Sequence, residues 1–271
     1  MFLVDTHCHI NAEYYPDGLE PVFANMLDNG VRRLVFASSD LKSSREAVEV
    51  AKRQLTEPEV YATVGIHPHE AGKVSQDYLS ELGELAREPR VVAIGEIGLD
   101  YYYELTPRDV QKRVFVEQIE FAKSIGKPVM LHLRSAKNTA DGDANSEALE
   151  ILRETKASET GGVVHCFSGT MQNALEALEM GFYISFDGPI TYPANMQLRE
   201  IAMEIPLDRI LCETDSPYLA PQGFRGRPNE PCHVRQVYEL LAMLKKMPLE
   251  DFAAAVRENG ERIFNIGAAN V

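Results

Sequence analysis

The stretch Val4-Asp5-Thr6-His7-Cys8-His9 continues an apolar segment, Met1-Phe2-Leu3-Val4, that is typical of a buried strand. Alternate side chains of a strand point to the same face, so we expect His7 and His9 on one side of the strand's end. Two imidazoles placed in this way can hold one divalent cation together. Because a metal site takes ligands from several segments, the rest of the chain should send further histidines or carboxylates to the same place.

The length and composition indicate one ordinary globular domain. The chain has 271 residues, of which 45% are hydrophobic and 25% are charged. These values are typical of globular proteins, and α/β barrels of this length are commonly single domains, so we predict one domain over residues 1–271. The apolar runs have the length of strands and are too short to cross a membrane. With no basic region followed by an apolar core at the N-terminus, we expect a cytoplasmic protein.

The charge and the cysteines exclude some classes of protein. A formal net charge of −14 argues against a protein that grips nucleic acid with a broad basic surface. It does not exclude a nucleic-acid substrate, because bound metal ions can supply positive charge locally. The four cysteines show no disulfide framework and no Cys-x-x-Cys pair, which fits a reducing compartment. They are Cys8, Cys166, Cys212 and Cys232.

Short apolar segments alternate with amphipathic helical segments along the chain. Eight such segments are expected to be strands, at 1–4, 33–37, 60–64, 91–94, 129–131, 163–164, 182–185 and 209–212. This alternation predicts a (β/α)8 TIM barrel, with two or three extra helices between His233 and Ile266 covering it. Functional groups of such barrels lie at the C-terminal ends of the strands.

Nearly every expected strand is followed by a histidine or a carboxylate. Six of these residues form a candidate ligand set for metal ions: His7, His9, Glu96, His132, His165 and Asp215. Six such ligands are too many for one cation, since a catalytic zinc usually takes three from the protein. They suit two divalent ions that share a bridging carboxylate and lie ~3.5–4 Å apart. Glu96 is the best candidate for that bridge because it is central in strand order. We therefore predict a two-metal hydrolase whose ions hold a hydroxide.

Several motifs give the chain a resemblance to a known family. Beside the first stretch these are Gly65-Ile66-His67-Pro68-His69, Gly95-Glu96-Ile97-Gly98-Leu99-Asp100-Tyr101, His132 with Arg134, His165-Cys166-Phe167-Ser168-Gly169, Glu213-Thr214-Asp215-Ser216-Pro217-Tyr218-Leu219-Ala220-Pro221, and Arg225-Gly226-Arg227 with Asn229-Glu230-Pro231. In this order and nearly from end to end, the chain resembles the TatD family of metal-dependent deoxyribonucleases, which belong to the amidohydrolase-like barrels.

The resemblance implies roles for individual residues. It implies that His7, His9 and Glu96 bind one metal, and that the other is bound by Glu96, His132, His165 and Asp215. It places His67 near the scissile phosphate and Glu213 beside the metal site, as a catalytic group or as a support for a ligand. The implied activity is hydrolysis of DNA that depends on two divalent ions (Mg, Mn or Zn), exonucleolytic in the 3'-5' direction on single strands, with a role in DNA repair.

The sequence leaves some substrate contacts open. Arg225 and Arg227, between glycine and proline, are candidates for contacting phosphate, and surface arginines are the alternative. Tyr101, in a run of three tyrosines, could stack on a base or pack in the core. In the mechanism that we expect, Glu96 and Asp215 act with the metals, while His67 and an arginine stabilise the negative charge of the transition state. DNA is the expected partner, and no obligate protein partner is indicated.

Three further features carry predictions. If strand alternation holds, Cys8, Cys166 and Cys212 face away from the ligands as small buried residues. Asp187 ends a strand but matches no ligand role. The family often has Arg-Asp-Ala after the fifth-strand histidine, whereas this chain has Arg134-Ser135-Ala136, followed by a polar segment to Asn145 that we expect to be a long loop at the substrate's edge.

Two other classes of function remain open. The first is another amidohydrolase-like metal hydrolase, such as a phosphoesterase, lactonase or amidase. Many of these bridge their metals with a carboxylated lysine, where this chain has Glu96, and polymerase-and-histidinol-phosphatase enzymes have a late Asp-x-His, where this chain has Asp215-Ser216-Pro217. The second is a catalytically silent barrel that binds metal or nucleic acid as a scaffold, against which the complete ligand set argues.

Overall fold

The computed structural model describes residues 1–9, 14–53 and 56–266 of the chain. Its centre is an eight-stranded sheet in which each strand pairs in parallel with the next in sequence, in the order β1 to β8. The strands are β1 Leu3–His9, β2 Val31–Ala37, β3 Glu59–Val64, β4 Val91–Asp100, β5 Val129–Arg134, β6 Gly162–Val164, β7 Tyr183–Phe186 and β8 Ile210–Cys212. With helices between successive strands, this is the predicted (β/α)8 TIM barrel.

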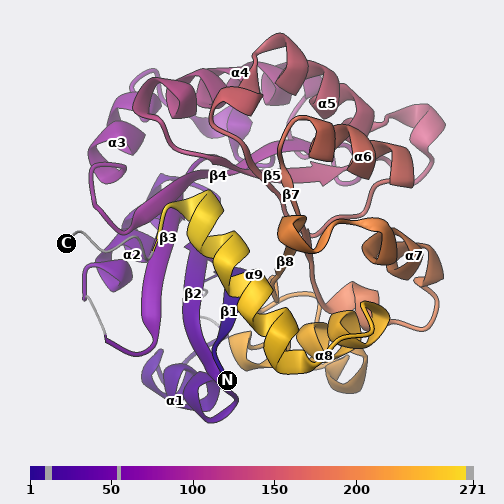
Figure 1. Cartoon of the computed structure of the whole chain (residues 1–271). Helices are drawn as coiled ribbons and strands as arrows, with labels where there is room; N and C mark the ends of the chain where they lie inside the picture. Colours follow the sequence, from indigo (N-terminus) through magenta and orange to yellow (C-terminus); the bar gives the residue numbers. More distant parts are fainter. Residues whose placement is uncertain (10–13, 54–55, 267–271) are drawn as a thin grey trace.

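The helices form a ring outside the strands (Figure 1). They are α1 Glu20–Asp28, α2 Leu41–Ala51, α3 Tyr78–Leu85, α4 Arg108–Ile125, α5 Ala144–Glu154, α6 Met171–Glu179, α7 Met196–Glu204, α8 Val234–Leu244 and α9 Leu249–Phe264. The C-terminal helix α9, yellow in Figure 1, packs against β1 and β8, where the first and last strands meet. The expected helical cover between His233 and Ile266 is therefore present.

Two strands are longer than the sequence indicated, and both carry site residues. β1 runs to His9 and β4 runs to Asp100, whereas we expected them to end at Val4 and at Ile94. The extension of β4 puts Glu96 inside a fully buried strand. A side chain at Gly95 could not fit there, because its Cβ would lie 2.4 Å from the Cβ of Met130 on β5. The Glu96 N–H donates to the Ser38 carbonyl at 2.8 Å, which fixes the backbone at this point.

The barrel closes through hydrogen bonds between β1 and the segment after β8. The Asp215 N–H donates to the His7 carbonyl at 3.0 Å, and the His9 N–H donates to the Ser216 carbonyl at 2.7 Å. Asp5, fully buried, accepts from the Thr214 N–H at 3.0 Å and from its hydroxyl at 2.6 Å. This closure brings two histidines near the start of the chain next to a carboxylate more than 200 residues later.

The Asp5→Ala variant should be markedly less stable. It removes both acceptors and leaves the N–H and the hydroxyl hydrogen of buried Thr214 without an acceptor, which costs about 2–4 kcal/mol in the free energy of unfolding. Urea denaturation followed by circular dichroism measures this loss. Asp5→Asn is the matched control, because it keeps the shape and one acceptor and should lose less. Equal stability of Asp5→Ala and the wild type would contradict this account of the closure.

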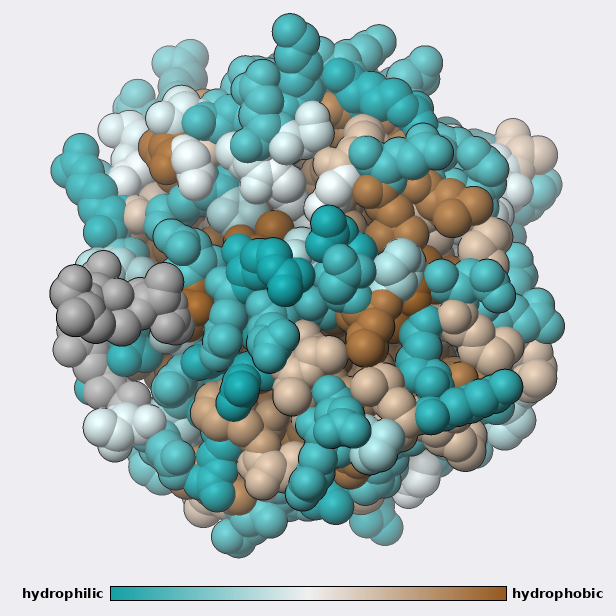
Figure 2. Space-filling model, viewed as in Figure 1, coloured by the Kyte–Doolittle hydropathy of each residue, from teal (hydrophilic) through white to brown (hydrophobic). Residues whose placement is uncertain are grey.

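The outer surface is mainly hydrophilic on the face that Figure 2 shows, and hydrophobic residues lie there in areas between the hydrophilic ones. Such a mixture is ordinary for a globular protein. None of the helices in the described part of the chain combines the length and the apolar character that a membrane crossing requires.

Candidate metal centre

The six candidate ligands come together at the C-terminal ends of the strands. His7 and His9 lie on β1, Glu96 on β4 and His132 on β5. His165 follows the end of β6 and Asp215 follows the end of β8. The structure thus brings all of these residues into one place, as the sequence analysis expected, although no bound ion tests their role as ligands.

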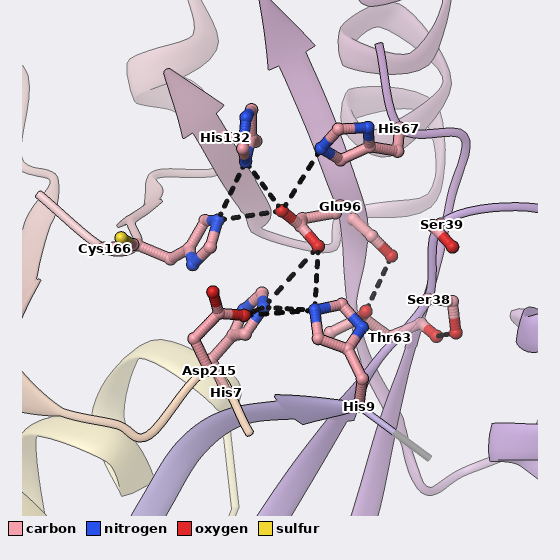
Figure 3. Close-up of polar contacts among 12 residues, drawn as sticks. His7, His9, Ser38, Ser39, Thr63, His67, Glu96, His132, Cys166 and Asp215 are labelled. Carbon is pink, nitrogen blue, oxygen red and sulfur yellow. Dashed lines mark hydrogen bonds and ion pairs between the residues drawn. The ribbon is translucent and has the colours of Figure 1, made fainter. Parts of the chain in front are cut away.

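The carboxylate of Glu96 lies between two groups of imidazoles (Figure 3). Its Oε2 is 3.5 Å from His7 Nε2 and 3.4 Å from His9 Nε2. Its Oε1 is 2.8 Å from His165 Nε2 and 3.0 Å from His132 Nδ1. One carboxylate oxygen therefore faces each group, which is the arrangement needed to bridge two cations.

Asp215 belongs to a different group than the resemblance implied. Its Oδ1 is 3.2 Å from His9 Nε2 and 3.5 Å from His7 Nε2. Oxygen and nitrogen atoms of His7, His9 and Asp215 lie within 4.8 Å of one another, as metal ligands do. The geometry therefore groups Asp215 with His7 and His9 rather than with His132 and His165, because the barrel closure holds it beside β1.

Two buried carboxylates fix which nitrogen of each histidine faces the site. Asp100 Oδ2 lies 3.0 Å from His132 Nε2, so that nitrogen carries the hydrogen and donates it, leaving the lone pair of Nδ1 for a metal. Glu213 Oε1 accepts from the Cys166 N–H at 2.6 Å and from His165 Nδ1 at 3.2 Å, so His165 presents Nε2 to the site. Glu213 is fully buried and acts through His165, as an orienting group of the kind common around metal ligands.

His67 is oriented as a hydrogen-bond donor to the site. Its Nδ1 accepts from the His69 N–H at 3.1 Å, so in the neutral ring the hydrogen lies on Nε2. That Nε2 is 3.7 Å from Glu96 Oε1. Burial and the neighbouring His132 hold the pKa of His67 well below its usual range, which keeps the ring neutral. His67 is therefore suited to donate to a substrate oxygen.

The electrostatics of the site favour cations. Burial opposes the charged form of Glu96, but the imidazoles of His165 and His7 outweigh it and hold the pKa of Glu96 well below its usual range. Burial and His165 oppose a charge on His7, yet Glu96 and Asp215 raise its pKa to about 9. The ionised carboxylates thus favour the protonated form of the buried His7 imidazole. Divalent cations would displace that proton and satisfy the same carboxylates.

The donor set fits such cations. Four imidazole nitrogens and two carboxylates converge within hydrogen-bonding or ion-pair distance of one another. Imidazole suits Zn, and carboxylate suits Mg and Mn, so this mixed set can take any of the three. His7, His9 and Asp215 would hold one ion and His132 and His165 another, with Glu96 between them.

Some predicted substrate residues lie elsewhere than expected. Tyr101 is 3% exposed, and its hydroxyl hydrogen bonds to Glu147 under the guanidinium of Arg108, so it cannot stack on a base. In the run of three tyrosines it is Tyr103 that lines the cavity at the metal centre, which Tyr218 lines as well. Arg225 and Arg227 are exposed and line neither of the two cavities at the barrel mouth, so a phosphate contact for them stays a prediction.

Cys166 does not face away from the site. β6 ends at Val164, so strand alternation no longer applies at Cys166, whose φ of 44° turns its side chain toward the mouth. Its Sγ lies 3.3 Å from Asp187 Oδ2, which gives Asp187 the partner that the sequence did not indicate. Burial and the charges of Asp187 and Asp215 raise the pKa of the Cys166 thiol. Cys8 and Cys212 are buried as expected.

Asp100 is the functional residue that sequence reasoning missed. It lies in the Gly95–Tyr101 motif, and its spacing of four from Glu96 puts both side chains on the same face of β4. This spacing in the sequence could have indicated that Asp100 faces the site, but only if β4 is known to continue past Ile94. Asp100 is fully buried and also lies 3.1 Å from His69 Nε2.

With the geometry established, comparison with known proteins identifies the family. A family model described as TatD related DNase matches residues 4–265. The chain belongs to the TatD-related DNase family. It is 40% identical over 264 residues to the uncharacterized metal-dependent hydrolase YabD of Bacillus subtilis, covering 97% of this chain and 99% of that one. A 3'-5' ssDNA/RNA exonuclease TatD of Cronobacter turicensis is 32% identical over 267 residues, covering 97% of each chain.

Solved structures agree with this assignment. YJJV, a TatD homolog from Escherichia coli K12, superposes with a TM-score of 0.87 at 30% identity and covers 98% of both chains. The protein is therefore a metal-dependent hydrolase of the TatD family that acts on ester bonds.

The Asp100→Ala variant should bind Mn²⁺ about 10–100-fold more weakly than the wild type. Loss of the carboxylate frees the His132 ring to change its tautomer and orientation, and partners of metal-bound histidines typically contribute this much. Isothermal titration calorimetry measures the affinity. Asp100→Asn retains an acceptor for the ring and should lose less. If Asp100→Ala bound Mn²⁺ as tightly as the wild type, Asp100 would not orient a ligand.

Proposed function

We propose that this TatD-family hydrolase is a deoxyribonuclease that cleaves phosphodiester bonds with two divalent ions, as a 3'-5' exonuclease on single-stranded DNA. DNA repair is the cellular role that such an activity would serve. The observation that carries the proposal is the carboxylate of Glu96, which turns one oxygen to His7 and His9 and the other to His132 and His165. A site for two neighbouring cations suits the in-line displacement at phosphorus, where charge builds on entering and leaving oxygens.

The residues of the chain divide the work of this reaction. Bound divalent ions would polarise the phosphoryl group and lower the pKa of a water molecule toward ~7. Asp215 lies beside His9 at the edge of both cavities, where its second oxygen can orient the attacking water. His67 directs its Nε2–H toward the same centre and can donate to a phosphoryl oxygen as negative charge builds on it.

The substrate class has support from a relative as well as from the site. The Cronobacter turicensis relative is named as an exonuclease acting on single-stranded DNA and RNA. The net charge of −14 disfavours binding of a polyanion over most of the surface. Divalent ions bound at the metal centre would supply positive charge locally, so DNA could bind there. DNA bound there would present one phosphodiester to the ions and leave the rest of the strand at the barrel mouth.

Digestion of 5'-labelled DNA tests the proposal. Single- and double-stranded oligonucleotides are incubated with the protein and Mg²⁺, Mn²⁺, Zn²⁺ or Co²⁺, and the products are separated on a denaturing gel. We expect a ladder of progressively shorter labelled products from the single strand, and no products once a chelator is added. Internal cuts without a ladder would indicate an endonuclease. A metal-loaded protein that cleaves no DNA with any of these ions would leave the scaffold alternative.

A further inference from the structure

Two cavities meet at the metal centre. The first has a volume of about 620 Å³ and extends over the ends of β2 and β3 toward α2. The second has a volume of about 390 Å³ and extends over the ends of β6 and β7 toward α7. His132, Arg134, Asp215 and Leu219 line both. A bond held at this centre therefore has one cavity on each side.

The walls of the two cavities differ in chemistry. The first is lined by five carboxylates, those of Asp40, Glu46, Glu70, Glu96 and Asp100, besides the shared Asp215. Among the residues that the structure describes, the second has only one carboxylate besides the shared Asp215, that of Asp187, and its wall includes the apolar residues Leu133, Phe167, Pro189, Leu198 and Ile201. At its edge lie the polar side chains of Ser168, Asn195 and Gln197. An apolar wall with amides and a hydroxyl at its edge suits a flat ring that carries hydrogen-bonding groups.

In-line attack on phosphorus requires the entering and leaving oxygens on opposite sides. The water enters opposite the leaving ester oxygen, and the retained ester oxygen lies roughly perpendicular to that axis. The two substituents of the phosphodiester therefore leave the centre in different directions. Two cavities that share the residues at the centre provide those directions. Both are within the size range of cavities that enclose a small ligand.

From this arrangement we propose that the second cavity is a nucleoside subsite, in which the base of the terminal nucleotide packs against the half-buried side chains of Pro189 and Leu198 while its phosphate lies at the metal centre. This inference rests on the proposed nuclease function and adds to it where the released nucleotide is bound. Every base has a flat ring that can pack against apolar side chains, so the subsite accepts any of the four bases.

Part of the wall of the second cavity is fixed by the contacts of Phe167. Phe167 is buried, its N–H donates to the Ser185 carbonyl at 3.1 Å, and its ring contacts that of Phe186 edge-to-face. A side chain at Gly169 would place its Cβ 3.0 Å from the Phe167 ring, so the motif that follows His165 holds this ring closely. These contacts hold this part of the wall in place when a ligand enters the cavity.

Arg134 stands where the two cavities join. Its guanidinium lies 4.3 Å from the Tyr102 ring and 4.9 Å from the Tyr103 ring. Among the described residues no carboxylate forms an ion pair with it, although carboxylates are numerous nearby. Its N–H groups are therefore available to a phosphate that spans the ridge between the cavities.

Comparison of two small ligands tests the subsite. The Mn²⁺-loaded protein is titrated by calorimetry with 2'-deoxyadenosine 5'-monophosphate and with 2-deoxyribose 5-phosphate, which has the same phosphate and sugar but no base. We expect the nucleotide to bind about 10- to 100-fold more tightly, because contact of a base with aromatic or apolar side chains contributes about this much to affinity. Equal affinities would overturn the subsite.

Ala194→Trp is the variant that tests the location. Ala194 is exposed at the edge of the second cavity, so a tryptophan there fills the cavity without disturbing the core. In this variant the nucleotide and deoxyribose phosphate should bind with about equal affinity, and the affinity for deoxyribose phosphate should be that of the wild type. Ala140→Trp, at an exposed alanine that lines neither cavity, is the matched control and should keep the preference. An unchanged preference in Ala194→Trp would place the base elsewhere.

The same samples separate the two hypotheses. If the wild type degrades single-stranded DNA but binds both small ligands equally, the subsite is wrong and the nuclease function stands. If the wild type degrades no DNA with any divalent ion, the proposed function fails and the subsite fails with it.

Discussion

The Glu96→Gln variant is expected to lose hydrolysis of DNA by a factor on the order of 10⁴ or more. Glutamine has nearly the same shape but only one oxygen and no negative charge. It can face His132 and His165 or His7 and His9, but it cannot bridge both groups. Stabilisation of the transition state by one of two cations amounts to several kcal/mol, and each 1.36 kcal/mol is a factor of ten in rate.

Metal content distinguishes loss of the bridge from loss of the fold. Elemental analysis of the dialysed protein should find fewer divalent ions per chain in Glu96→Gln than in the wild type, with an unchanged circular dichroism spectrum. Glu84→Gln, an exposed position on α3, is the matched control and should retain both activity and metal. A Glu96→Gln protein with full metal content and wild-type activity would refute the bridging carboxylate.

The sequence was sufficient for the barrel because its signal is local. Each strand is an apolar run, and alternation with amphipathic helices determines a parallel sheet with right-handed connections. The ends of strands were less certain, as β4 shows. Polar Glu96 and two glycines interrupt its apolar pattern, so the run seemed to stop at Ile94. The pairing of β4 with β5, which continues to Asp100 and Arg134, carries the strand further.

A candidate ligand set can be drawn from the sequence because metal chemistry restricts the residue types. Histidines and carboxylates at strand ends form a short list, and the barrel brings strand ends together. The grouping was not predictable from spacing. Asp215 lies with His9 because hydrogen bonds between β1 and the segment after β8 close the barrel, and those bonds join residues more than 200 positions apart.

Supporting residues were harder to predict than ligands. Glu213 and Asp100 have the same task, since each accepts a hydrogen bond from the outer nitrogen of a histidine. The sequence points to Glu213 through its neighbour Asp215, whereas nothing adjacent to Asp100 points to it. Cys166 was misplaced for a related reason: its direction depends on a positive φ at the end of a three-residue strand, which no side-chain pattern reveals.

The His67→Ala variant should lower kcat for DNA hydrolysis by about 10²–10³-fold, the usual effect of removing one donor to a developing oxyanion. His67 Nε2 is aimed at the centre as an N–H donor, since Nδ1 is engaged by the His69 backbone. A donor that acts on the transition state affects kcat, whereas a ligand affects metal content. Steady-state kinetics on a fluorescent single-stranded oligonucleotide measures kcat and KM separately.

The result for metal content decides between the two roles of His67. Elemental analysis should find wild-type amounts of metal in His67→Ala, in contrast to Glu96→Gln. His67→Gln restores an amide N–H at about the same reach and should recover part of the lost kcat, whereas a purely structural role would give no such recovery. If His67→Ala lost metal in proportion to activity, His67 would be a ligand, and its Nε2 would have to be free of the hydrogen that the His69 contact assigns to it.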